Sequence, residues 1–245
     1  RSDWFACACC PPNIARLIGG LWDYIYTAAE DTVNVHLYIA GDAKVQVGNS
    51  ILNITQTTSY PENGRIHFKV QADTDREITL ALRIPGWAEH YTLRLNGQEL
   101  TPDKVEKGYA YLTRPWAEAA ELEVEFDMQP RFMCANRKIH YDLGRTAIMR
   151  GPVVYCLEEV DNGKDLHLLE VNPDGKYEIK DSEICGNPVK VVEMDGFRVV
   201  DTAKKDGELY HVYKRKEKEA VELKFVPYYT WANRGENEME VWIRI

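Results

Sequence analysis

The chain has 245 residues, enough for one or two domains of about 150 residues each and for a sizeable hydrophobic core. Hydrophobic residues make up 44% of the chain and charged residues 28%, a balance that excludes an intrinsically disordered protein. Lys and Arg number 30 against 39 Asp and Glu, and the formal charge of -9 argues against a nucleic-acid-binding protein. No apolar run approaches the roughly 18 residues that span a bilayer, so no membrane segment is expected.

The first predicted element is a short amphipathic helix. Pro11 and Pro12 suit a first helical turn, and an apolar stripe with helical spacing follows at Ile14, Leu17, Ile18 and Leu21. The rest of the sequence offers no second helix against which this stripe could pack. The chain also begins without an initiator methionine. We therefore expect residues 1–27 to be the tail of a helical domain whose body lies upstream.

From about Thr32 onward the hydrophobic period is two, which is typical of half-buried β-strands. The runs that show this period span residues 33–39, 66–70, 78–84, 122–128, 153–155, 189–192, 209–213, 221–226 and 239–245. Asn-Gly or Asp-Gly pairs lie between them, at residues 63–64, 96–97, 162–163, 174–175, 195–196 and 206–207. Such pairs accept the positive φ of tight hairpin turns, so the strands are predicted to be antiparallel.

The predicted fold class is all-β, with two tandem antiparallel β-sandwiches after the helix left over from the helical domain. The number of short strands would crowd a single sandwich. The stretch least like a strand, residues 129–151, contains Pro130 and Gly144 and places the boundary near Pro130. The predicted domains are thus 1–27, 28–130 and 131–245. The same stretch is also compatible with a long crossover inside one shared sandwich.

Three of the six cysteines, Cys7, Cys9 and Cys10, are clustered. Thiolates are strong nucleophiles and soft ligands, and this spacing lets two sulfurs share one zinc ion, which would lower a thiol pKa. The spacing is not that of a zinc finger or ribbon, because no second Cys or His knuckle follows. A metal or nucleophile role, a redox pair and a merely exposed cluster are all compatible with these residues. Cys134 and Cys156 lie in apolar, strand-like contexts and are expected to be buried free thiols.

The aromatic residues offer an alternative function, because sugars stack on exposed Trp and Tyr side chains. A carbohydrate-binding β-sandwich module would use some of Trp87, Trp116, Trp231 and Trp242, with the densest aromatic segment at residues 227–235. The competing interpretation is core packing, which is where most such side chains lie in a sandwich. The histidines and carboxylates show no spacing that singles out a metal site or an acid/base pair.

Four segments occur in a characteristic order from one end of the chain to the other. They are residues 4–16 (WFACACCPPNIAR), 83–87 (RIPGW) with 95–97 (LNG), 150–158 (RGPVVYCLE) and 227–235 (PYYTWANRG). Together they resemble glycoside hydrolase family 127. The resemblance implies a retaining β-L-arabinofuranosidase, with an (α/α)6 catalytic barrel followed by two β-sandwiches, acting on an arabinose-containing carbohydrate.

The same resemblance implies roles for the clustered cysteines. In the family the adjacent cysteines bind zinc, and the first attacks the anomeric carbon as a thiolate. The match implies that Cys9 is the nucleophile and a zinc ligand and that Cys10 is a second zinc ligand, while Cys7 has no implied role. The remaining ligands, a Glu and a Cys, and the acid/base Glu belong to family segments upstream of residue 1. We therefore expect this chain by itself to be catalytically silent and zinc-free, with sandwiches that buttress the barrel or mediate assembly.

The expected partner is the upstream barrel of the same chain. The exposed apolar stripe of the first helix would favour artificial homo-oligomers of this chain. Related families share the cysteine motif, so an exact substrate linkage does not follow from it. Bacterial periplasmic and cytoplasmic locations are both compatible with the sequence.

Overall fold

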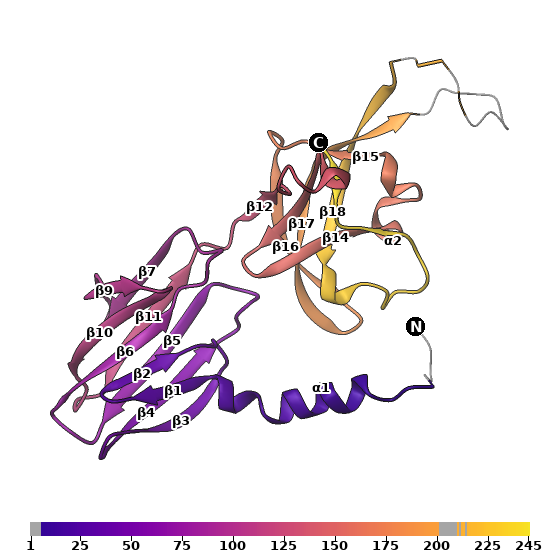
Figure 1. Cartoon of the computed structure of the whole chain (residues 1–245). Coiled ribbons are helices and arrows are strands. Elements are labelled where there is room, and N and C mark those ends of the chain that lie inside the picture. Colours follow the sequence, from indigo (N-terminus) through magenta and orange to yellow (C-terminus); the bar gives the residue numbers. More distant parts are fainter. Residues whose placement is uncertain (1–5, 201–209, 211, 214) are drawn as a thin grey trace. The chain divides into compact units, whose positions relative to one another are not determined.

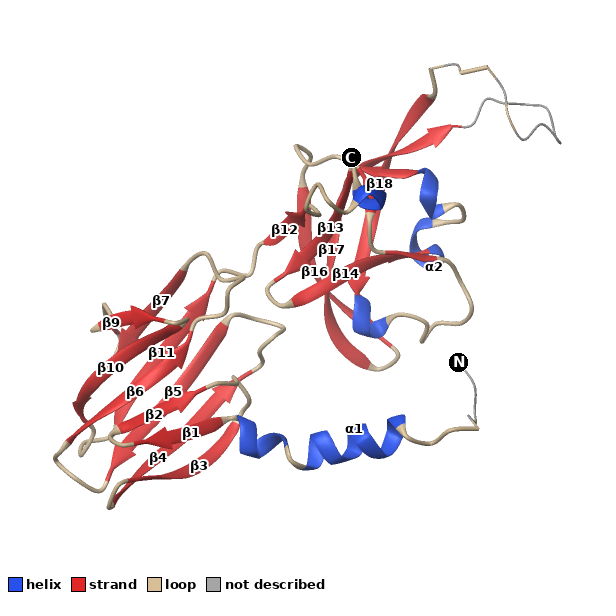
Figure 2. Cartoon of the chain, in the orientation of Figure 1, coloured by secondary structure: helices blue, strands red, loops and turns tan. Residues whose placement is uncertain are grey.

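The computed structural model describes residues 6–200, 210, 212–213 and 215–245. Strands dominate it and helices are few and short (Figure 2), which confirms the all-β fold class. The chain divides into two compact units, Arg1–Met128 (the N-terminal unit) and Gln129–Ile245 (the C-terminal unit). In the part of the chain that the structure describes, no helix combines the length and apolar character needed to cross a membrane.

The N-terminal unit opens with α1 (Cys10–Gly19) and the 3-10 turn η1 (Leu21–Tyr24). Pro11 and Pro12 occupy the first turn, where a missing amide donor costs no hydrogen bond. The amide of Gly20 donates to the carbonyl of Arg16 at 3.0 Å and ends the helix. No residue of α1 is buried, and Figure 1 shows the helix extending away from the strands that follow it.

Two sheets form the rest of the N-terminal unit. The first has the order β1-β2-β6-β10-β9, with β2 and β6 parallel, and the second has the order β3-β4-β5-β11-β7-β8. The strands of the first sheet are β1 (Tyr26–Ala29), β2 (Thr32–Val35), β6 (Glu77–Arg83), β10 (Tyr109–Pro115) and β9 (Lys104–Glu106). Those of the second are β3 (Gly41–Val47), β4 (Ser50–Thr58), β5 (Arg65–Ala72), β11 (Ala120–Phe126), β7 (Tyr91–Leu95) and β8 (Gln98–Glu99).

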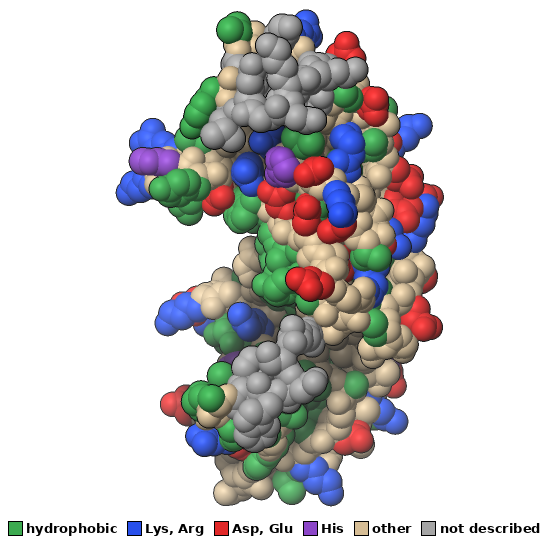
Figure 3. Space-filling model, turned by 90° about the vertical axis from the view of Figure 1, so that its right-hand side faces the viewer, with side chains coloured by type: hydrophobic (Ala, Val, Ile, Leu, Met, Phe, Trp, Pro, Cys, Tyr) green, Lys and Arg blue, Asp and Glu red, His purple; other side chains and the backbone are tan. Residues whose placement is uncertain are grey.

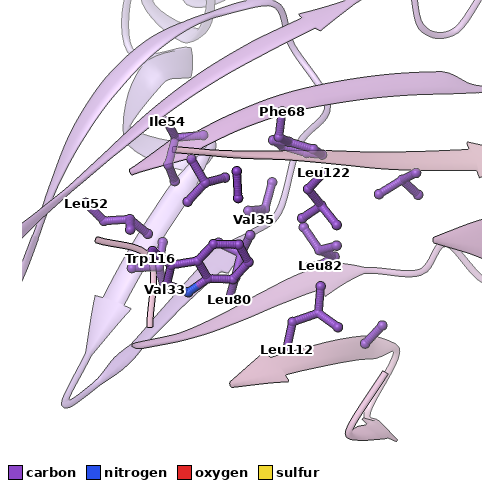
Figure 4. Close-up of a cluster of buried hydrophobic side chains, with 14 of the residues drawn as sticks. Val33, Val35, Leu52, Ile54, Phe68, Leu80, Leu82, Leu112, Trp116 and Leu122 are labelled. Atoms are coloured by element: carbon purple, nitrogen blue, oxygen red, sulfur yellow. The ribbon is translucent and has the colours of Figure 1, made fainter. Parts of the chain in front are cut away.

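These two sheets share one hydrophobic core, to which both contribute side chains (Figure 4). Buried residues alternate along the strands, as in β5, where Ile66, Phe68 and Val70 are all completely buried. Trp116 is also inside this core, and its indole N–H donates to the carbonyl of Ile78 at 2.9 Å. The period of two in the sequence therefore marks the inward face of each strand, because side chains alternate across a sheet.

In the C-terminal unit the strands belong to one sheet. They are β12 (Pro130–Met133), β13 (Arg145–Arg150), β14 (Val153–Glu158), β15 (Leu169–Val171), β16 (Tyr177–Ile184), β17 (Asn187–Val200), β18 (Glu217–Pro227), β19 (Met239–Glu240) and β20 (Ile243–Arg244). Pairing runs from β13 through β20, β15, β17, β18 and β14 and back to β13. The sequence predicts a two-sheet sandwich here, whereas the β13–β14 and β15–β20 pairings join these strands into a closed ring.

This sheet buries apolar side chains on both faces. Along β14, Tyr155 and Leu157 belong to one hydrophobic cluster, while Cys156 between them belongs to another. Four short elements connect the strands: η2 (His140–Asp142), α2 (Glu159–Asn162), η3 (Leu166–Leu168) and η4 (Tyr228–Thr230). Figure 3 shows Lys and Arg side chains interspersed with Asp and Glu over the face it draws, without a continuous basic area.

The predicted hairpin turns are partly confirmed. Asn96 and Gly97 both have positive φ, 50° and 78°, and join β7 to β8. The prediction is wrong for Asp195 and Gly196, which lie within β17. A Cβ on Gly196 would lie 2.4 Å from Cδ1 of Leu223, so this glycine permits close packing rather than a turn. The pair at residues 206–207 lies outside the described residues.

Candidate functional site

The three clustered thiols lie at the start of α1. Cys10 is the first residue of the helix and Cys9 is its N-cap. The carbonyl of Cys9 accepts hydrogen bonds from the amide of Asn13 at 3.3 Å and from its side chain at 2.9 Å. The side chains of Cys7, Cys9 and Cys10 are all exposed. The turn that enters the helix thus holds the three thiols together at one end of α1.

The spacing of two of these thiols suits a shared zinc ion. The Sγ atoms of Cys9 and Cys10 are 3.8 Å apart, and those of Cys7 and Cys9 are 3.4 Å apart. Two thiolates on one tetrahedral zinc ion, each about 2.3 Å from the metal, lie about 3.8 Å from each other. No group of three or more Cys, His, Asp or Glu side chains within the described residues could hold a metal ion. A complete coordination shell around Cys9 and Cys10 would therefore need ligands from outside these residues.

The thiols also differ in acidity. A backbone hydrogen bond from Cys9 lowers the pKa of Cys7. Hydrogen bonds with the side chains of Cys7 and Cys10 raise the pKa of Cys9, and these outweigh the lowering effect of the backbone amides. The thiol of Cys9 is therefore less acidic than an ordinary cysteine in this chain. Activating it as a nucleophile at neutral pH would need a positive charge or a metal ion beside it.

The apolar face of α1 begins next to the thiols and continues along the helix. A groove of about 770 Å³ is lined by Ala6, Pro11 and apolar residues of the helix, with Cys7 and Cys10 at one end. Ile14 and Leu17 are each 57% exposed and Ile18 is 67% exposed. The apolar stripe predicted from the sequence is thus present on α1, and no other described part of the chain covers these three side chains. Burying such side chains is worth about 25 cal/mol per Å², so this face favours a covering partner.

The predicted aromatic platform is only partly exposed. Trp116 lies inside the core of the N-terminal unit. Trp87 is partly buried against this core and stacks on Tyr60, with ring centroids 6.5 Å apart. Trp231 stacks on Tyr228, with centroids 6.0 Å apart and an interplanar angle of 22°. Tyr228 is 44% exposed. Among the aromatic residues that the sequence singled out, those available to a ligand therefore belong to the C-terminal unit.

Sequence reasoning missed a buried charge cluster in the C-terminal unit. Glu158, at the end of β14, is completely buried, and its carboxylate pairs with the guanidinium of Arg234 at 2.5 Å. Arg234 also pairs with Asp161, and Glu158 accepts a hydrogen bond from the amide of Ala232 at 3.2 Å. Burial alone would lower the pKa of Arg234, but the hydrogen bonds to Asp161 and Glu158 outweigh it and raise the pKa. Carboxylates are so frequent in this sequence that only the fold singles out Glu158.

Comparison with known families decides the identity of the chain. Residues 32–128 match the model of the β-L-arabinofuranosidase GH127 middle domain, and residues 130–244 match that of the glycoside hydrolase family 127 C-terminal domain. The chain belongs to glycoside hydrolase family 127. This confirms the resemblance found in the four sequence segments.

Three similar proteins are arabinofuranosidases by name. The non-reducing end β-L-arabinofuranosidase of Bifidobacterium longum subsp. longum is 36% identical over 261 residues, covering 100% of this chain and 38% of that protein. A crystal structure of a GH127 β-L-arabinofuranosidase from Geobacillus stearothermophilus T6 is 38% identical with a TM-score of 0.93, covering 100% of this chain and 38% of that one. A solved GH127 β-arabinofuranosidase is 35% identical with a TM-score of 0.87, covering 100% and 40%. The chain thus spans about two fifths of the length of these GH127 proteins.

The segments that carried the family resemblance have identifiable structural roles. In the RGPVVYCLE segment, Arg150 pairs with Val153 across a tight turn, so this segment forms the β13–β14 hairpin. In the RIPGW segment, the carbonyl of Arg83 accepts a hydrogen bond from the hydroxyl of Tyr38, and Trp87 packs in the core. These parts of the GH127 pattern maintain the fold, whereas the exposed Cys7–Cys10 segment does not.

Thiol reactivity distinguishes the remaining cysteines. Cys134 and Cys185 are exposed, so the prediction of a buried Cys134 is wrong: it follows the end of β12. Cys156 is buried, as predicted, and burial together with the charge of Glu158 raises its pKa to about 12.

We expect a thiol reagent at about pH 8 to modify the other cysteines of the native chain quickly and Cys156 slowly, because only the thiolate reacts and Cys156 is both buried and protonated. Peptide mass mapping against reaction time measures this, with denatured chain as the control in which Cys156 reacts as well. Equal labelling rates for Cys156 and Cys185 in the native chain would contradict the prediction.

Proposed function

We propose that this chain is the C-terminal accessory part of a retaining β-L-arabinofuranosidase whose catalytic helical barrel lies upstream. The observation that carries the proposal is the thiol pair at the start of α1. Cys9 and Cys10 have the separation that a shared zinc ion requires, on a helix whose apolar face is uncovered. A chain that spans about two fifths of its relatives' length supports the view that the cover is an upstream domain.

In this proposal Cys9 is the nucleophile and a zinc ligand, and Cys10 is a second zinc ligand. Bound zinc would supply the positive charge that keeps the Cys9 sulfur deprotonated at neutral pH. The sulfur attacks the anomeric carbon, a C–S bond forms, and the glycosidic C–O bond breaks. The leaving oxygen takes a proton from a carboxylic acid, and the resulting carboxylate then activates the water that hydrolyses the C–S bond.

This chain by itself is then expected to be inactive and zinc-free. The hydrogen-bonded, exposed thiol of Cys9 has a raised pKa, which is the opposite of what a nucleophile needs. Within the described residues no carboxylate joins the thiols in a metal site. A nucleophile without its proton donor, its sugar pocket and its metal lacks the positioning and proton-transfer contributions to catalysis.

The two β units would then support the barrel or mediate assembly. The exposed side chains of Ile14, Leu17 and Ile18 on α1 are the expected contact with the upstream domain. The helix that begins after Cys9 continues through η1 directly into β1 of the N-terminal unit. The proposed nucleophile is therefore linked by a short stretch of chain to the unit that would support the barrel.

The test compares this chain with the same chain extended upstream through its helical domain. We expect the extended protein to bind zinc and to hydrolyse an aryl β-L-arabinofuranoside, and this chain to do neither. Zinc content by elemental analysis and release of the aryl group measure the two properties. Hydrolysis by this chain alone would contradict the accessory role, and an extended protein that binds zinc without cleaving the arabinofuranoside would contradict the proposed reaction.

A further inference from the structure

A groove of about 580 Å³ lies on the C-terminal unit, well separated in sequence from the clustered cysteines. Its volume is within the range of small-molecule sites, about 300–1,000 Å³. The walls combine two aromatic residues, Tyr228 and Trp242, with three charged ones, Asp142, Arg145 and Glu240, and three further apolar side chains. The walls come from η2, β13, β14, η4 and the segment from β19 to β20, so the groove is built entirely within one unit.

One wall of this groove is held in place by the buried charge cluster. Tyr228 lies in η4, and its ring stacks on Trp231, which fixes the ring's orientation. The segment that follows Trp231 is held by the buried carboxylate of Glu158. This carboxylate accepts a hydrogen bond from the amide of Ala232 and forms an ion pair with Arg234. An aromatic side chain on an anchored segment loses little conformational freedom when a ligand binds.

A second part of the wall is fixed by Arg145. Its guanidinium donates to the carboxylate of Glu240 at 2.9 Å and to the carbonyl of Trp242 at 3.0 Å. These bonds use one nitrogen, Nη1 of Arg145, and one oxygen, Oε1 of Glu240. A guanidinium has five N–H donors and a carboxylate accepts at about four positions, so both groups retain hydrogen-bonding capacity. The carboxylate of Asp142 adds a further acceptor to the lining.

We propose that this groove is a saccharide-binding site of the C-terminal unit. The ligand needs an apolar face that can stack on Tyr228 and Trp242. It also needs hydrogen-bond donors for the carboxylates of Asp142 and Glu240. A hydrogen-bond acceptor must face the guanidinium of Arg145. Sugar rings have both, since their C–H faces stack on aromatic rings and their hydroxyls donate and accept. The expected sugar is an L-arabinofuranosyl oligosaccharide, and this assignment of the sugar rests on the proposed function.

Charge favours a neutral, hydroxyl-rich occupant over a segment of protein. The lining carries one cation and two carboxylates, and an apolar protein segment laid over it would desolvate Asp142 and Glu240 without replacing their hydrogen bonds with water. A sugar replaces these bonds with its own hydroxyls. Binding here would keep a polymeric or branched carbohydrate bound to the enzyme.

The experiment is a calorimetric titration of this chain with β-L-arabinofuranosyl oligosaccharides, with cellobiose as the unrelated sugar. We expect saturable binding of the arabinose oligosaccharides that the Tyr228→Ala variant weakens about tenfold, because the stacking partner is lost. Asp142→Ala is the second variant, which removes a hydrogen-bond acceptor from the lining and keeps the test valid if Tyr228→Ala unfolds. The matched control is Tyr177→Ala. Tyr177 lies in the same unit outside the groove lining, and its side chain is 43% exposed against 44% for Tyr228.

Loss of binding in Tyr228→Ala and Asp142→Ala with full binding in Tyr177→Ala supports the site. Absence of saturable binding, or equal losses in all three variants, overturns it. Concentration-dependent self-association that Tyr228→Ala abolishes also overturns it, because the groove would then hold a second copy. Hydrolysis by the extended protein is measured in parallel: hydrolysis without groove binding refutes this site alone, and groove binding without hydrolysis refutes the proposed reaction alone.

Discussion

Replacing Cys9 with Ala in the protein extended through its helical domain is expected to lower kcat for β-L-arabinofuranosides by about four orders of magnitude or more. The expectation follows from the proposed covalent mechanism, in which no other group can take over the attack on the anomeric carbon. The neighbouring Sγ of Cys10 is 3.8 Å away, and in the proposal it serves the metal. Steady-state hydrolysis of an aryl β-L-arabinofuranoside measures the loss.

The three neighbouring cysteines provide an internal comparison for this experiment. Cys10→Ala is expected to lower both zinc content and kcat, because the proposed second zinc ligand is lost. Cys7→Ala removes an equally exposed thiol from the same segment and is expected to leave kcat within severalfold of the original. A Cys9→Ala protein that keeps substantial activity, or a Cys7→Ala protein that loses as much as Cys9→Ala, would refute the assignment of the nucleophile.

Replacing Glu158 with Gln is expected to destabilise the C-terminal unit by about 3–5 kcal/mol. Glu158 is completely buried, and the change leaves the guanidinium of Arg234 with less compensating negative charge in a mostly buried position. It also weakens the bond that the amide of Ala232 makes with this carboxylate. Hydrogen exchange resolved by peptide measures the effect in the C-terminal unit separately from the N-terminal one.

The matched control is Glu178→Gln in the same unit. Glu178 pairs with Lys180 at 3.2 Å, but its side chain is 73% exposed, so the loss of this pair is expected to leave stability unchanged. Glu158→Gln and Arg234→Met are expected to be non-additive, because they remove two ends of one interaction. Additive effects, or a Glu158→Gln protein as stable as Glu178→Gln, would show that the buried pair does not anchor this unit.

Local patterns in the sequence were sufficient for some of the elements. The predicted runs missed β3, β4, β10 and β16, and the stretch described as least like a strand contains β12 and β13. Alternation of apolar residues predicted strands such as β5 and β6, because an apolar residue at every second position can only be buried by a strand. The stripe of α1 and its proline start were equally readable. The cysteine spacing in residues 7–10 placed the candidate site at the start of this helix. Four short segments were enough to identify the family.

Contacts between residues far apart in the sequence could not be predicted from these local patterns. Residues 195–196 have the composition of a turn, yet they lie inside β17, because Gly196 permits close packing against Leu223. Trp87 and Tyr228 look alike as sugar-binding candidates, but the first is packed in a core and the second lines a groove. Their surroundings come from strands far away in the chain, which a local pattern does not encode.

The sequence by itself determined that this protein is an all-β member of glycoside hydrolase family 127 with clustered thiols before a lone amphipathic helix. Only the tertiary structure decided that the strands of the C-terminal unit pair in a ring, and that Glu158 and Arg234 meet in its interior. The physical reason is range: propensity and alternation act over a few residues, whereas sheet closure and buried ion pairs depend on which distant segments the packed core brings together.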